Sequence, residues 1–338
     1  MKDAAILVRA LRDPASTTAL DSGGWTALLT LARAELLLGT LARRLEGIDL
    51  PQPIQAALID ARLNAEYQRR SALWEADCAR RALTEFDGGI VLMKGTAYVA
   101  AGLKAGEGRH IGDLDIMVAH KAIAGAERLL LTQGGWEWVK EDAYDDAYYR
   151  DHMHELPPMI HKERDRMIDV HHTILPMTAR PQPDAAAMLD DAIDIGNGLS
   201  IFAPEDMVCH CAAHLIADGD LTGGLRNLWD MHCLLSEFSA QDTQFWAQLA
   251  ARSRHHQLQP AVQRAARLSA RLYGTSIPQS WAKAHWHDSL FIRRILARDG
   301  WGRGSAPLTR LLFYIRSHWL RMPPLMLARH LWTKWRKA

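Results

Sequence analysis

The sequence predicts an α+β protein in which a small mixed β-sheet of about four or five strands is flanked by two helical regions. Apolar residues recur at helical spacing in the first part of the chain and again after Pro204, whereas the middle contains short apolar runs bounded by Gly and turn residues. We therefore divide the 338 residues into a helical region 1–87, an α/β core 88–203, and a helical region 204–338 that ends in a basic, tryptophan-containing tail.

The N-terminal region has the pattern of packed helices. Leucines between Leu28 and Leu41 fall at helical spacing. Residues 49–53 interrupt the pattern, and Pro53 suits the first turn of a new helix. Residues 54–85 contain neither Gly nor Pro, which predicts one long helix or two abutting helices.

Short strands and helices alternate in the core. Apolar Leu114, Ile116 and Val118 alternate with other residues, which predicts a strand over 113–118. The remaining expected elements are strands at 90–93, 136–140, 152–161 and 167–174, a short β-like piece at 199–202, helices at 96–104 and 121–133, a Gly-rich loop at 105–112 and a charged turn at 162–166.

Composition excludes several classes of protein. The net charge of +1 gives no global reason to expect a nucleic-acid binder. The four cysteines form no C-x-x-C pair and predict free thiols in a reducing compartment. Charges within the first apolar run argue against a signal peptide, and no apolar stretch is long enough to cross a bilayer. We expect a soluble, cytoplasmic protein.

Two carboxylates stand out on the strand predicted at 113–118. Asp113 and Asp115 occupy alternate positions and therefore point to the same face. Their Cα atoms would lie roughly 6 to 7 Å apart, which suits two Mg²⁺ ions about 3.5 to 4 Å apart. Mg²⁺ prefers oxygen ligands. If the strand at 167–174 is a neighbour, Asp169 adds a third carboxylate.

A phosphate-binding turn is predicted upstream of these carboxylates. Lys94, Gly95 and Thr96 stand where a strand ends and a helix begins, and backbone N–H groups at such a junction bind phosphate. Gly95 would allow close backbone approach. Arg109, four residues before Asp113, is a further candidate phosphate ligand, and the alternative is that it pairs with a carboxylate at the edge of the core.

These motifs resemble those of a known family. Gly95-Thr96 followed by Asp113-Leu114-Asp115-Ile116 resembles the signature of the DNA polymerase beta-like nucleotidyltransferase superfamily. The closer resemblance is to a bacterial branch of uncharacterised nucleotidyltransferases and covers roughly residues 20 to 240. The matching motifs are Lys94-Gly95, Arg109, Gly112-Asp113-Leu114-Asp115, Ile168-Asp169-Val170-His171, His214, and Arg226 with Asp230.

The resemblance implies Mg²⁺- or Mn²⁺-dependent transfer of a nucleoside monophosphate from an NTP, with ATP expected, to a hydroxyl of a small molecule, a peptide or protein, or RNA. The implied roles are metal binding and catalysis by Asp113, Asp115 and Asp169; nucleotide binding by Lys94, Gly95, Thr96, Arg109 and Gly112; and substrate contact or proton transfer by His171, His214, Arg226 and Asp230. Two alternatives stay open: a catalytically silent nucleotide- or partner-binding module, and a related phosphotransferase acting on a peptide.

Several polar groups have a simpler structural interpretation. The segment 152–172 is rich in histidine but has no zinc motif, so we expect polar strand faces rather than a zinc site. His210 and His214 are expected to lie buried beneath the active site. Arg226 and Asp230, four residues apart, are expected to form an ion pair within one helix.

The C-terminal tail has an unusual charge balance. Residues 301–338 contain eight Lys or Arg residues and no Asp or Glu, with tryptophans interleaved. Three interpretations stay open: a solvated helical face anchored by tryptophan, a surface for an anionic partner such as RNA or a nucleotide, and a helix that lies on an anionic membrane.

Overall fold

The computed structural model describes residues 4–140, 143–321 and Trp332 and confirms the α+β class. One mixed sheet has seven strands in the order β3-β4-β5-β2-β1-β7-β6, more than the four or five expected. The central strands β2 and β5 are parallel, and β1 is antiparallel to β2. The strands are β1 (Val91–Leu92), β2 (Asp113–Met117), β3 (Trp136–Trp138), β4 (Met159–His161), β5 (Met167–His171), β6 (Ile193–Gly196) and β7 (Leu199–Ile201).

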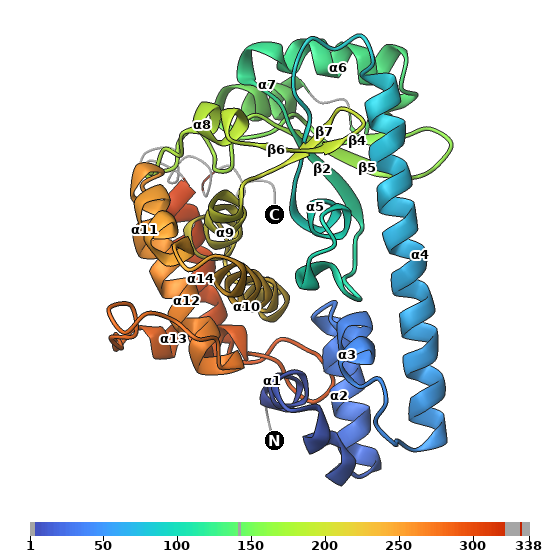
Figure 1. Ribbon diagram of the computed structural model, residues 1–338, viewed down its shortest axis with the longest axis vertical. Coiled ribbons are helices and arrows are strands. Elements are labelled where there is room, and N and C mark those ends of the chain that lie inside the picture. Colours follow the sequence, from blue (N-terminus) through green and yellow to red (C-terminus); the bar gives the residue numbers. More distant parts are fainter. Residues whose placement is uncertain (1–3, 141–142, 322–331, 333–338) are drawn as a thin grey trace.

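Helices cover both sides of this sheet, with α6 and α7 on one side, α5, α9 and α10 on the other, and α4 alongside (Figure 1). No described helix is both long and apolar enough to cross a membrane. The helices are α1 (Ala5–Arg12), α2 (Ser22–Ala34), α3 (Leu38–Arg44), α4 (Gln52–Ala82), α5 (Lys94–Ala100), α6 (Ile123–Thr132), α7 (Ala143–His152), α8 (Ala185–Asp190), α9 (Pro204–Ala212), α10 (Gly224–Gln241), α11 (Phe245–His255), α12 (Gln259–Tyr273), α13 (Asp288–Ile295) and α14 (Pro307–Arg321).

The strand count rises because β6 and β7 form a hairpin at the sheet edge. The turn contains Asn197 and Gly198, both with positive φ, and Asn-Gly is a strong hairpin signal. β7 pairs with β1 in parallel, with Val91 opposite Ser200. Only the second strand of this hairpin was expected from the sequence, although the turn signal was present.

The strand expected over 152–161 was wrong in its first half. His152 ends helix α7, and only Met159–His161 forms a strand, β4. Pro157 and Pro158 lack the N–H groups that a continuous ladder needs. The segment before them still lies against β5, because the Leu156 N–H donates to the Val170 carbonyl at 2.9 Å.

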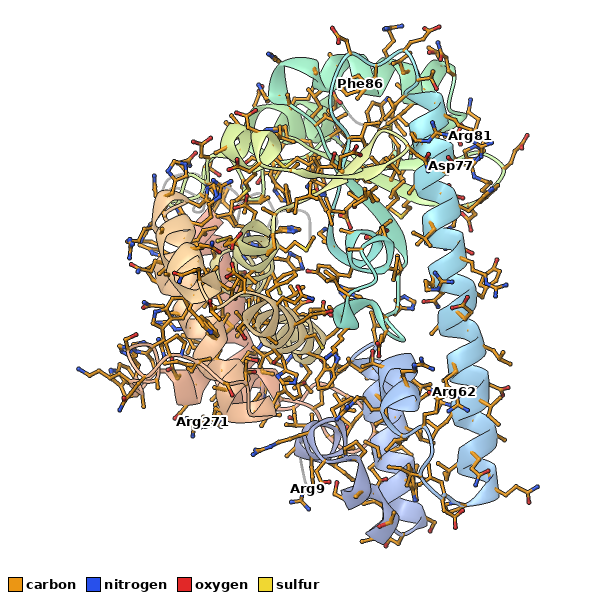
Figure 2. All side chains as sticks on the ribbon, viewed as in Figure 1. Arg9, Arg62, Asp77, Arg81, Phe86 and Arg271 are labelled. Carbon is orange, nitrogen blue, oxygen red and sulfur yellow. The ribbon has the colours of Figure 1, made fainter. Side chains whose placement is uncertain are left out.

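Helix α4 is one continuous helix that holds the β4–β5 turn. Its outer face carries ion pairs such as Asp77 with Arg81, whose charged atoms lie 3.2 Å apart (Figure 2). On its inner face, buried Glu75 accepts a hydrogen bond of 2.9 Å from Arg164 in the turn. The Arg164 guanidinium also lies 5.0 Å from the centre of a Trp136 ring. Arg164 therefore fixes the charged turn to α4, although most of the turn's other side chains are exposed to solvent.

The N-terminal helices also contact the loop that leads into β2. Helix α3 and this loop meet at Gly39 and Gly108, and a Cβ at Gly108 would lie 2.5 Å from the Gly39 carbonyl carbon. Gly108 has φ +66°, which favours glycine. In addition, Gln68 of α4 accepts a hydrogen bond of 3.1 Å from the Ile111 N–H. The backbone just before Asp113 is thus positioned by the N-terminal helices.

This contact predicts a stability difference between two glycine variants. Gly108→Ala combines a positive φ with the collision at Gly39, whereas Gly102→Ala has the same φ of +66° and no atom within 4 Å of the new Cβ. We expect the free energy of unfolding of Gly108→Ala to be lower than that of Gly102→Ala by about 1–3 kcal/mol. Urea unfolding measures both values, and equal losses would contradict the tight contact.

Candidate functional site

The three predicted carboxylates meet at the centre of the sheet. β2 and β5 are neighbours in parallel, and their register places Asp115 directly opposite Asp169. Side chains at paired positions of adjacent strands point to the same face. One carboxylate oxygen from each of Asp113, Asp115 and Asp169 lies within 4.8 Å of the other two. Asp113 is exposed, and Asp115 is buried.

Two side chains contact the buried carboxylate of Asp115. The Lys94 ammonium donates to its Oδ1 at 2.5 Å, and Nε2 of buried His171 lies 3.0 Å from the same oxygen. Burial alone would raise the pKa of Asp115, but the charge of Lys94 and the hydrogen bonds more than offset it and hold this pKa well below its usual range. Asp115 is therefore ionised.

Lys94 reaches Asp115 from a strained backbone position. It follows β1 and begins helix α5 with φ +48°, which is uncommon for a residue with a Cβ. The preceding Met93 N–H donates to the Asp115 carbonyl at 3.0 Å, so the turn is joined to β2. Burial disfavours the ammonium charge, but Asp115, Asp113 and Glu155 raise the pKa of Lys94 above its usual range. Strained positions of this kind cluster at functional sites.

Asp169 experiences the surplus negative charge of the cluster. Burial, together with the charges of Asp115 and Glu155, raises the pKa of Asp169 to about 7. Three hard oxygen donors with excess negative charge form a set that suits Mg²⁺ or Mn²⁺. The residues of this site thus fit the divalent ions that the sequence motif implies.

A fourth carboxylate, Glu155, belongs to the same network and was missed in the sequence. Its Oε2 lies 3.3 Å from His171 Nδ1 and 3.7 Å from His154 Nε2. The rings of the two histidines stack with centres 5.3 Å apart. The three side chains are close enough to hold one ion. The expected absence of a zinc site in this segment therefore stays a prediction.

A second group of predicted residues surrounds a small cavity of about 30 Å³ beside Lys94. This volume matches about one water molecule or slightly more. Polar and charged side chains from the loop before β2 and from α9 and α10 line most of it. The lining residues are Lys94, Tyr98, Arg109, His210, Cys211, His214, Arg226, Asn227 and Asp230.

The main ion pair at this cavity differs from the expected one. Asp230 accepts a hydrogen bond of 2.8 Å from Arg109, and both side chains are buried. No ion pair joins Arg226 to Asp230 among the described residues, so the pair expected within one helix was wrong. Arg109 takes that place because the loop before β2 packs against α10. The Arg226 Nε is buried without a hydrogen-bond partner.

His210 in α9 and His214 in the π-helical turn after it differ in exposure. His210 is buried, and its ring contacts Phe202 with centres 5.8 Å apart, so the expectation for His210 is confirmed. His214 is exposed, so the expectation that it is buried was wrong. The α-helix changes at Ala213 into a π-helix, Ala213–Asp218, which alters the alignment of residues four apart. π-helical turns are rare and occur often at functional sites.

The turn that follows Lys94 is closely packed. A Cβ at Gly95 would lie 3.1 Å from both Arg109 Nη1 and the Ile111 side chain, so a larger residue here would need these side chains to shift by a few tenths of an ångström. The Thr96 hydroxyl is buried and has no hydrogen-bond partner. Gly112 is exposed directly before Asp113.

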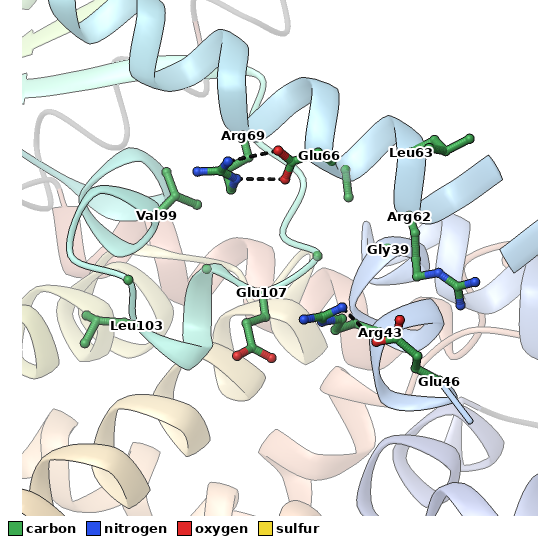
Figure 3. Close-up of a pocket in the computed structure, with 14 residues that line it drawn as sticks. Gly39, Arg43, Glu46, Arg62, Leu63, Glu66, Arg69, Val99, Leu103 and Glu107 are labelled. Atoms are coloured by element: carbon green, nitrogen blue, oxygen red, sulfur yellow. Dashed lines mark hydrogen bonds and ion pairs between the residues drawn. The ribbon is translucent and has the colours of Figure 1, made fainter. Parts of the chain in front are cut away.

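The pocket shown in Figure 3 encloses about 510 Å³ and lies apart from the carboxylates, between α3, α4 and the segment after α5. Its charged side chains are partly paired with one another, as in Glu66 with Arg69 and Arg43 with Glu46. The residues that line it include none of the carboxylates or histidines of the site. The predicted catalytic residues therefore lie outside this pocket, on the strands of the sheet.

The Arg109–Asp230 pair predicts a large stability effect. Asp230→Asn leaves a buried guanidinium without its counter-charge and should lower the free energy of unfolding by about 3–5 kcal/mol. Glu46→Gln, which removes the carboxylate of the exposed Arg43 pair, should change it by less than about 1 kcal/mol. Chemical denaturation of both variants provides the comparison. If both variants lose similarly little free energy of unfolding, the buried pair contributes little to stability.

Comparison with known proteins places this site in a family. The chain matches the family described as uncharacterised nucleotidyltransferase over residues 21–274, which includes every residue of the carboxylate cluster and of the adjoining cavity. No curated protein matches the chain. Because the match covers most of its length, this protein belongs to the uncharacterised nucleotidyltransferase family.

Proposed function

We propose that this protein transfers a nucleoside monophosphate from an NTP, with ATP as the expected donor, to an acceptor hydroxyl in a Mg²⁺- or Mn²⁺-dependent reaction. The observation that carries the proposal is the meeting of three carboxylates from adjacent parallel strands within 4.8 Å, in a chain of a nucleotidyltransferase family. We also propose that the core belongs to the DNA polymerase beta-like superfamily and that the protein acts in the cytoplasm.

Asp113, Asp115 and Asp169 would hold the metal ions. When bound, such ions lower the pKa of the attacking hydroxyl and stabilise the charge that develops on the phosphates. Lys94 and His171 keep Asp115 ionised, as a metal ligand must be. The exposed position of Asp113 leaves one side of the cluster open to substrate.

Asp169 is the proposed base. The acceptor oxygen forms a bond to the α-phosphorus, the bond from that phosphorus to the bridging oxygen breaks, and pyrophosphate leaves. The proton of the acceptor hydroxyl passes to the Asp169 carboxylate, which bound metal ions would keep ionised and so able to accept it; the pKa of about 7 is that of the metal-free protein.

We place the triphosphate against the carboxylates on the side where the small cavity beside Lys94 lies, because the cavity itself has room for only about one water molecule. Lys94, Arg226 and exposed His214 provide donors on one side of the carboxylates, and Arg226 has no carboxylate partner among the described residues. Arg109 stays a candidate phosphate ligand, although a phosphate would share its guanidinium with Asp230. Gly95, Thr96 and Gly112 would position the backbone beside the nucleotide. The region 204–338 thus contributes to a site that the core 88–203 alone would leave incomplete.

The first test is nucleotide turnover. With each NTP, Mg²⁺ or Mn²⁺ and a panel of acceptor classes, we expect pyrophosphate release that Asp113→Asn reduces by roughly two orders of magnitude or more. Asp113 is exposed, so this variant should fold normally. Asp60→Asn makes the same change on the exposed face of α4 and should leave turnover intact.

Product mass separates the alternatives. Addition of a nucleotide supports the proposal, whereas addition of a phosphate alone would identify a phosphotransferase. If no acceptor class gives pyrophosphate release and NTP binding does not depend on Asp113 or on metal, the proposal fails. The silent binding module would then be the better description.

The raised pKa of Asp169 predicts a pH-dependent stability in metal-free protein. The folded state holds a proton on Asp169 up to about pH 7, whereas the unfolded chain loses it near pH 4, so the folded state binds more protons in between. The contribution of Asp169 to stability should fall as the pH rises from about 4 to 7 and then level off. Urea unfolding should show that the free energy of unfolding of Asp169→Asn increases relative to that of the wild type as the pH rises across this range. If the two free energies change with pH in parallel, the raised pKa of Asp169 is contradicted.

A further inference from the structure

Helix α14 packs on the protein mainly through one face, although His318 on another side of the helix is buried too. Thr309, Phe313 and Ser317 are buried, and the Phe313 ring contacts the Phe291 ring of α13 with centres 4.9 Å apart. Arg316 also points inward, because it donates to the Ile216 carbonyl at 2.7 Å and its guanidinium lies 5.0 Å from the centre of the Phe291 ring. The C-terminal end of the helix is attached as well, because the Thr178 hydroxyl donates to the Arg321 carbonyl at 2.5 Å and the Arg180 guanidinium lies 5.3 Å from the centre of the Trp319 ring.

The opposite face of α14 is also apolar. At 100° per residue, five large apolar side chains fall within a stripe about 100° wide that points away from the buried face. We call this set the outer stripe. Its members and their exposed fractions are Leu308 (82%), Leu311 (54%), Leu312 (52%), Ile315 (53%) and Trp319 (45%). A solvated helix has polar residues on this face, so the interpretation of α14 as a solvated helical face does not fit.

The segment that contains the outer stripe carries charge of one sign, and its arginines on α14 lie on other sides of the helix than the stripe. Arg310 and Arg321 lie on α14, and the whole segment 301–338 has eight basic residues and no acidic residue. The sequence after α14 continues as apolar and basic residues. A helix with an apolar stripe, a tryptophan and an excess of arginine is the type that lies in the interface of an anionic bilayer.

We propose that α14 binds an anionic lipid surface, with the outer stripe inserted at the boundary between headgroups and acyl chains and with basic residues near the lipid phosphates. A lipid surface fits better than a protein partner for two reasons. The stripe lies on the convex surface of a single helix. In addition, no residue of α14 lines the two cavities described above or two further cavities of about 290 and 330 Å³. The segment also has no carboxylate with which to form the mixed ion pairs of a protein interface.

Vesicle sedimentation tests this proposal on the full chain. We expect the protein to sediment with vesicles of phosphatidylcholine and phosphatidylglycerol, to sediment less with phosphatidylcholine alone, and to be partly released by high salt. The double variant Leu312→Glu with Ile315→Glu should lower the partition coefficient at least about tenfold, because it removes buried apolar area and adds repulsion. Both side chains are exposed, so circular dichroism should remain unchanged.

A matched pair of substitutions on α4 provides the control. Leu63→Glu with Ile59→Glu makes the same change at side chains that are 66% and 46% exposed, and it should leave most of the binding intact. Equal loss in both double variants would overturn the proposal, because only net charge would then matter. No binding to anionic vesicles, or a dimer that the α14 double variant dissociates, would also overturn it, the latter by identifying a second copy as the occupant of the stripe.

Discussion

The buried negative charge of Asp115 is the constraint on which the centre of this protein depends. A carboxylate in such surroundings would be prohibitively costly without partners. Its two partners come from different elements, Lys94 from the turn after β1 and His171 from β5. β1 and β5 must therefore flank β2, and this is the order at the middle of the sheet. The unusual backbone angle of Lys94 is tolerated because the same turn is hydrogen-bonded to β2.

Other buried charges connect parts of the chain that are far apart in sequence. Glu75 on α4 holds Arg164 of the β4–β5 turn, and Arg109 in the loop before β2 holds Asp230 on α10. Glu35 at the end of α2 contacts Arg298 and accepts from the backbone N–H of α10 at Leu225. Each pair would be costly if only one member were present, so together these pairs favour a single arrangement of the helices around the sheet.

The sequence was informative wherever a local pattern determined the structure. Alternation predicted that Asp113 and Asp115 share a face, and the register of β2 with β5 brought Asp169 to them as expected. Glu155 could not be found in this way, because two prolines interrupt its segment and only pairing with β5 brings it to His171. The partner of Asp230 was misassigned for a similar reason, since helical spacing identifies neighbours within α10 and says nothing about a loop packed against it. His214 differs because the helix changes its hydrogen-bond pattern.

The meeting of Gly39 with Gly108 has a mechanical consequence. Two backbones touch there without intervening side chains, so no rotamer change can absorb a displacement of one against the other. The Gln68 hydrogen bond to Ile111 fixes the same loop a few residues later. The loop before β2 is therefore held to both α3 and α4 within a few residues of Asp113. The N-terminal helices thus help to position the backbone that carries Asp113, the first of the three carboxylates.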